Sequence, residues 1–153
     1  MAFLLGLGLL ASACSVSASS DSGSCSTAEV SAQLKSRYSL GDLPQVSSFR
    51  FCEKEDKDGF AANMYFVAKP DDGVAYLESL GMRWKDFVRA SPRDVTRLSQ
   101  AEGEGWRLRD GENYLTSSRS REWNGECLVD YRAFVPEGKS WKGEVFIGVY
   151  CEE

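Results

Sequence analysis

The chain contains five cysteines, an odd number, and no histidine among its 153 residues. In an exported protein, an odd count leaves one thiol outside the set that can form disulfides, so this thiol needs a separate role. The absence of histidine excludes Ser-His-Asp and Cys-His nucleophile systems, an imidazole general base and any zinc site that contains histidine. No two cysteines have Cys-x-x-Cys spacing, so we expect no metal and no cofactor.

The length and net charge narrow the class of protein further. A chain of 153 residues is the size of one compact domain. The net charge is −5, whereas proteins that bind nucleic acid normally carry a basic surface. We therefore expect no nucleic-acid partner.

The N-terminus has the composition of an export signal. Residues 2–10 are apolar and uncharged, but they are too few to span a bilayer as a helix, which takes about 20 residues. They match the apolar segment of a secretory signal peptide. The Ser-rich stretch that follows is typical of a flexible tether. The sequence therefore predicts a signal peptide over 1–13, a tether over 14–24 and a single globular domain over 25–153.

Two interpretations of processing compete at Ala11, Ala13 and Cys14. Small residues at the two alanine positions suit ordinary signal peptidase, which would release a secreted protein. Small residues directly before a cysteine also resemble the lipobox of bacterial lipoproteins. That resemblance implies that Cys14 carries a diacylglycerol and anchors the protein to the extracytoplasmic face of the cell membrane. An uncleaved anchor is a third alternative.

The C-terminal segments predict a β-hairpin. Segments 127–135 and 143–151 can pair antiparallel with residue numbers that sum to 278, which makes one face of the hairpin apolar throughout. This register places Cys127 opposite Cys151, close enough for a disulfide.

The remaining pair is then Cys25 with Cys52. Four cysteines allow three connectivities, and an even count in an exported domain points to two disulfides. The predicted pairing follows from the hairpin register and would tie the first helix to the first hairpin.

Capping signals predict the helices. Ser26 and Glu29 form a capping-box pattern before a short helix over 27–37. Pro70 and the two aspartates after it are typical of a helix start. Ser91, followed by Pro-Arg-Asp, indicates another helix start.

Aromatic and β-branched residues predict a first hairpin from segments 46–52 and 60–68, with the charged loop 53–59 between them. We therefore expect an α+β fold: an antiparallel sheet of four to six strands, stapled by disulfides, with two or three helices packed on one face.

A basic stretch is a candidate anion-binding face. Residues 83–121 hold nine cationic and six acidic side chains, and the candidates are Arg83, Arg89, Arg93 and Arg97. They would bind an acidic polymer, a phospholipid headgroup or an acidic partner. The alternative is that they are solvated surface residues.

The whole pattern resembles the small predicted lipoproteins of actinobacteria. The similarity rests on the lipobox, the Ser-rich spacer, Leu43-Pro44 before the first hairpin, and a last strand that ends in Val149-Tyr150. It covers most of residues 10–151. The resemblance implies a location and a fold, and no catalytic residue.

We therefore expect a non-catalytic envelope lipoprotein domain that binds an extracytoplasmic protein or polymer. The alternative is a secreted inhibitor of an extracellular protease or hydrolase, with an exposed inhibitory loop at 53–59 or 136–142. A third hypothesis is a hydrolase of cell-wall glycans, which needs two inward-facing carboxylates about 5–10 Å apart.

Overall fold

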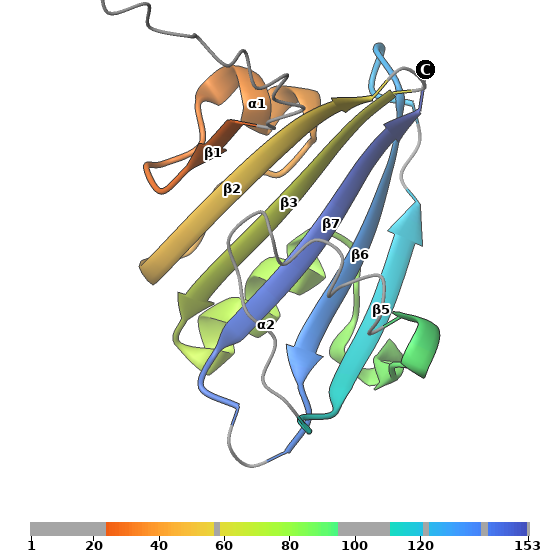
Figure 1. Ribbon diagram of the computed structural model, residues 1–153. Helices are drawn as coiled ribbons and strands as arrows, with labels where there is room; N and C mark the ends of the chain where they lie inside the picture. Colours follow the sequence, from red (N-terminus) through yellow and green to blue (C-terminus); the bar gives the residue numbers. More distant parts are fainter. Residues whose placement is uncertain (1–23, 57–58, 95–110, 121–122, 139–140, 153) are drawn as a thin grey trace, which may run out of the picture.

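The computed structural model describes residues 24–56, 59–94, 111–120, 123–138 and 141–152. These residues form one antiparallel sheet of seven strands in the order β1-β2-β3-β7-β6-β5-β4 (Figure 1). The strands are β1 (Ser24–Ser26), β2 (Val46–Asp56), β3 (Gly59–Ala68), β4 (Val88–Arg89), β5 (Tyr114–Ser120), β6 (Leu128–Pro136) and β7 (Glu144–Glu152). The helices are α1 (Ala32–Arg37), α2 (Pro70–Ser79) and the 3-10 helix η1 (Trp84–Asp86).

The predicted α+β class is compatible with this architecture, but the strand count of four to six was too low. The two outermost strands, β1 and β4, have only three and two residues. Strands this short carry no alternating pattern that a sequence could display.

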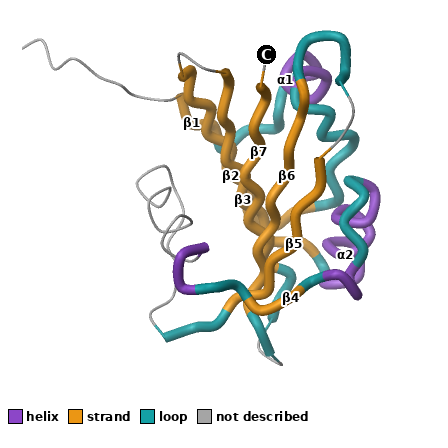
Figure 2. The backbone as a smooth tube through the Cα atoms, turned by 90° about the vertical axis from the view of Figure 1, so that its right-hand side faces the viewer, coloured by secondary structure: helices purple, strands orange, loops and turns teal. Residues whose placement is uncertain are grey.

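The main core lies between the sheet and the helices α1 and α2, which cover one face (Figure 2). Alternate residues of the central strands point into it, and Met64, Phe66, Val145 and Ile147 are completely buried. The opposite face carries a smaller apolar cluster of Tyr114, Phe134 and Phe146. Part of the opposite face is therefore buried as well.

The first helix is shorter than the predicted range 27–37. It begins after Ser31, whose hydroxyl accepts a hydrogen bond from the Leu34 amide at 3.3 Å. The predicted capping box is wrong. Ser26 instead accepts from the amide of Ala28, and Glu29 pairs with Lys35.

The segment before α1 contains the edge strand β1. Cys25 lies directly opposite Cys52 in the β1–β2 ladder, with a Cα–Cα distance of 4.0 Å, and the two form a disulfide. The backbone of residues 24–26 is therefore extended.

The second helix matches its signals. Pro70 occupies its first turn, and Gly81, with φ of +86°, follows its end. Leu77 and Leu80 are buried, and so is Tyr76.

The helix start predicted at Ser91 is also present. The Ser91 hydroxyl accepts from the Asp94 amide, and the Asp94 carboxylate accepts from the amide and hydroxyl of Ser91. This turn lies on the opposite side of the sheet from α1 and α2 (Figure 2), where Asp94 pairs with Arg132 of β6. The helical segments therefore do not all pack on one face.

The register of the C-terminal hairpin differs from the prediction by two residues. Val129 pairs with Cys151, Tyr131 with Val149 and Ala133 with Ile147, so that paired numbers sum to 280 instead of 278. A shift of two leaves every side chain on its predicted face, so the apolar pattern cannot distinguish the two registers.

Cys127 consequently lies just before the first paired residue of β6, and its bond to Cys151 runs diagonally between β6 and β7. Their Cα atoms are 5.4 Å apart, and the predicted disulfide forms. This distance lies within the usual range for a disulfide, so the pairing was right although the register that suggested it was not.

Candidate functional site

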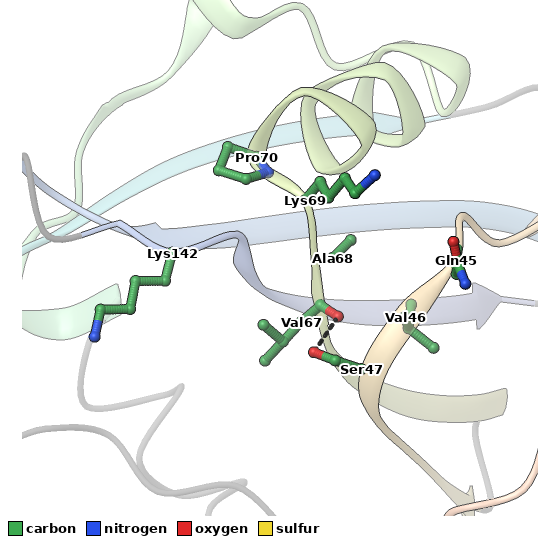
Figure 3. Close-up of a pocket in the computed structure, with 8 residues that line it drawn as sticks. All are labelled: Gln45, Val46, Ser47, Val67, Ala68, Lys69, Pro70 and Lys142. Atoms are coloured by element: carbon green, nitrogen blue, oxygen red, sulfur yellow. Dashed lines mark hydrogen bonds between the residues drawn. The ribbon is translucent and has the colours of Figure 1, made fainter.

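A groove of about 570 Å³ lies where β2 begins and β3 ends. Its lining comes from three places in the chain: residues 45–47, residues 67–70 and Lys142 (Figure 3). They belong to the start of β2, the junction of β3 with α2, and the segment just before β7. The groove is thus a product of the tertiary fold.

A close backbone approach brings these segments together. The amide of Ala68 donates to the carbonyl oxygen of Gly143 at 3.1 Å. Gly143 has φ of +88°, and a Cβ atom there would overlap the carbonyl oxygen of Ala68. Only glycine tolerates both conditions, so Gly143 positions Lys142 beside the β3–α2 junction that carries Lys69.

The walls of the groove are mainly apolar. Val46, Val67 and Pro70 contribute hydrocarbon surface, and Ser47 lies at a register shift between β2 and β3. The Ser47 hydroxyl donates to the carbonyl oxygen of Val67 at 3.2 Å, as the dashed line in Figure 3 shows. This bond holds the irregular start of β2 against β3.

Lys69 and Lys142 make the groove cationic. Both side chains are exposed, and within the described residues neither forms an ion pair with a carboxylate. Lys69 extends from the helix junction on the side of Gln45, whereas Lys142 points outward at the other end (Figure 3). The groove therefore has an apolar floor with a positive charge at each end.

Acidic side chains already compensate the start of α2. Asp71 and Asp72 occupy its first turn, where a carboxylate interacts favourably with the helix dipole. The positive charge of the groove is consequently that of its two lysines.

A second, smaller cavity of about 270 Å³ is lined by Asp42 and Asp72, together with Tyr76 and Ser79. Both aspartates are exposed, and the Tyr76 hydroxyl donates to the carbonyl oxygen of Leu40. Within the described part of the chain, no three His, Cys, Asp or Glu side chains cluster as metal ligands. We regard this cavity as a surface depression.

Two of the four predicted anion-binding arginines pair with carboxylates. Arg83 pairs with Asp86 at 2.7 Å, and Arg89 donates two hydrogen bonds to the carboxylate of Glu137, each of 3.0 Å. Arg93 is exposed in the turn after Ser91, and Arg97 lies outside the described residues.

The sequence Trp-x-Gly-Glu occurs twice, at 123–126 and 141–144, and its glycines, Gly125 and Gly143, both have positive φ, of +99° and +88°. Their tryptophans differ. Trp141 stacks on Trp84 with ring centroids 4.9 Å apart, while Trp123 is 55% exposed.

The Trp141–Trp84 stack has covered ring faces. Phe87 packs on Trp84, and Gly73 of α2 lies close beneath Trp141. The Trp141 indole donates to the carbonyl oxygen of Glu144. The stack therefore joins η1 to α2 and to the segment before β7.

The loop expected at 53–59 is mostly strand, because β2 continues to Asp56 and β3 begins at Gly59. In the other loop considered for an inhibitor, the described residues are 136–138 and 141–142. Cys14, the predicted lipidation site, lies outside the described residues.

Sequence reasoning missed the groove. Lys69 and Lys142 come from distant parts of the chain, and isolated lysines in polar surroundings carry no signal. The one available clue was the glycine after Lys142, whose conformation allows the close approach to Ala68.

Comparison of the chain with protein-family models, curated proteins and solved structures gave no match. Among the described residues, no helix has the length and apolar character needed to cross a membrane.

Proposed function

We propose that this chain is a non-catalytic envelope lipoprotein domain, anchored through a lipid on Cys14, that binds an extracytoplasmic protein partner. The observation that carries the proposal is the pairing of four of the five cysteines in two disulfides. Disulfides persist in oxidising, extracytoplasmic compartments. The pairing leaves Cys14 as the odd cysteine, directly after an apolar leader.

The groove supports a binding role. It combines an apolar floor with two exposed lysines that have no carboxylate partner among the described residues. Binding sites commonly pair apolar walls with a few polar groups that fix orientation. The lining contains no carboxylate, cysteine or histidine, so its side chains favour recognition over catalysis.

The lipid anchor is tested by expressing the full chain, including the predicted signal peptide over 1–13, in a bacterium that processes lipoproteins. We expect the mature protein to begin at Cys14, to carry the mass of a diacylglycerol and to partition into detergent. Cys14→Ser is expected to lose the lipid and the partitioning. A mature wild-type N-terminus at Cys14 without acyl mass would contradict the anchor.

The binding role is tested separately by chemical cross-linking in intact envelopes. We expect one envelope protein to be cross-linked reproducibly to the wild-type chain, and also to a form of the chain exported without the lipid. Cross-linking only to an anionic cell-wall polymer would contradict a protein partner.

A further inference from the structure

One edge of the sheet is incompletely covered. β2 has eleven residues, but β1 pairs only with its segment 51–53. Within the described residues, the outer edge of β2 over 46–50 has no neighbouring strand. An uncovered strand edge presents backbone donors and acceptors that can pair with another extended chain.

The cationic groove adjoins this uncovered edge. Val46 and Ser47 belong both to the start of β2 and to the lining of the groove. The register shift between Val46 and Ser48 interrupts the ladder between β2 and β3. A chain added to β2 would therefore pair along 48–50, and its next residues would enter the groove.

We propose that this edge receives an extended acidic segment of the partner protein as an additional strand, with carboxylates of that segment paired with Lys69 and Lys142 at the two ends of the groove. The inference rests on the proposed function and names the chemistry of its partner. The backbone edge supplies sequence-independent hydrogen bonds. The lysines at the end of the edge select for negative charge.

Charge disfavours a second copy of the chain as the occupant. The edge segment 45–50 reads Gln-Val-Ser-Ser-Phe-Arg and contains no acidic residue. Symmetric pairing of two such edges would bring Arg50 of each copy toward the lysines of the other. An acidic partner removes that repulsion.

The test begins with a displayed library of random peptides, selected on the full wild-type protein and counter-selected on Lys69→Glu/Lys142→Glu. We expect enrichment of β-forming sequences with an acidic residue at a constant position. Resynthesised peptides should bind the double variant at least about tenfold more weakly, because two favourable ion pairs become repulsive.

Two controls separate strand addition from simple charge attraction. Arg93→Glu makes a charge change of the same sign, half that of the double variant, beyond β4 at the other edge of the sheet, and we expect it to leave the affinity unchanged. Methylating alternate backbone amides of the peptide keeps its charge but removes hydrogen-bond donors. Two peptides are compared, one methylated on the odd-numbered amides and one on the even-numbered amides. We expect only the peptide whose methylated amides face β2 to lose binding.

Several outcomes would overturn the proposal: no enrichment, enriched peptides without acidic residues, or binding that persists whichever set of alternate amides is methylated. Binding of polyglycerol phosphate but of no peptide would assign the lysines to a polymer. Circular dichroism of the double variant checks that it is folded. A reproducible cross-linked partner together with a failed peptide selection would refute this inference and leave the proposed function intact.

Discussion

At the scale of single residues, Gly143 has the strictest requirement in the described structure. Two features constrain it: its φ is positive, and a Cβ atom there would overlap the carbonyl oxygen of Ala68. Gly125, in the matching Trp-x-Gly-Glu segment, has only the first feature. Gly125 also has a positive φ, but a Cβ atom there would meet no atom within 4 Å.

This difference makes a matched pair of substitutions. Gly125→Ala should lower the free energy of unfolding by about 1–2 kcal/mol, the cost of a left-handed conformation in an L-residue. Gly143→Ala should lower it by more than about 4 kcal/mol, because the backbone must also move. Urea denaturation measures both values. Equal losses would show that the contact with Ala68 imposes no constraint.

The exposed ion pair between Glu29 and Lys35 ties the segment before α1 to the helix, at 2.8 Å. The hydrogen bond from Lys35 is the main cause that lowers the pKa of Glu29 below 4.5. The reciprocal bond raises the pKa of Lys35 above 10.5. The stabilisation is therefore present at neutral pH. It is lost as acid titrates Glu29 through its lowered pKa, or as base titrates Lys35 through its raised one.

NMR titration of the Glu29 carboxyl carbon tests this coupling. In the wild type we expect a titration midpoint below 4.5, and in Lys35→Met a midpoint that moves up toward 4.5. A midpoint that does not respond to the substitution would exclude the ion pair in solution.

At the scale of elements, tyrosine hydroxyls hold the chain that follows α1 over the core. The hydroxyl oxygen of Tyr131, in β6, lies 2.7 Å from the carbonyl oxygen of Tyr38 and 3.0 Å from the carbonyl oxygen of Ser39. Tyr76 of α2 donates to the carbonyl oxygen of Leu40 at 3.0 Å. Because Tyr38 and Leu40 are completely buried, these hydroxyls satisfy backbone groups that water cannot reach.

Removing one hydroxyl should therefore be costly. Tyr131→Phe is expected to lower the free energy of unfolding by about 1–3 kcal/mol, the penalty for an unsatisfied buried acceptor. Tyr150→Phe is the control, because Tyr150 is 52% exposed and should change stability by less than about 0.5 kcal/mol. Thermal denaturation followed by near-UV circular dichroism measures both, and equal effects would contradict the assigned role.

At the scale of the whole molecule, the two disulfides staple the sheet in two places. Cys25–Cys52 joins the edge strand β1 to β2, and Cys127–Cys151 joins the start of β6 to β7. Their sequence separations are similar, 27 and 24 residues. The entropy of loop closure therefore predicts nearly equal contributions, about 3–4 kcal/mol each.

Burial should make the two bridges behave differently. Cys127 and Cys151 are both buried, whereas Cys25 is exposed. We expect limited reductant to open Cys25–Cys52 first, as measured by alkylation and peptide mapping. We also expect Cys127→Ala/Cys151→Ala to destabilise more than Cys25→Ala/Cys52→Ala, because it also leaves a core cavity. If reductant opened Cys127–Cys151 before Cys25–Cys52, the expected order of reduction would be wrong.

Local signals predicted the elements that local physics controls. The Pro-Asp-Asp start of α2, the Ser91–Asp94 cap and the apolar faces of β6 and β7 are all present. The predicted start of the first helix is wrong: Ser26 accepts from the Ala28 amide, Glu29 pairs with Lys35, and the helix begins after Ser31. Propensity is a weak prior wherever a tertiary contact competes with it.

The sequence alone determined the α+β class, the presence of two disulfides and the faces that strands bury, because residue type, an even number of remaining cysteines and alternation encode these properties directly. Only the tertiary structure decided the register of β6 against β7, which is shifted by two residues from the predicted one. It also decided the short strands β1 and β4 and the groove between Lys69 and Lys142. A shift of two preserves alternation, and strands of two or three residues have too little of it to detect. The groove depends on Gly143 approaching Ala68, a contact between segments that no local pattern relates.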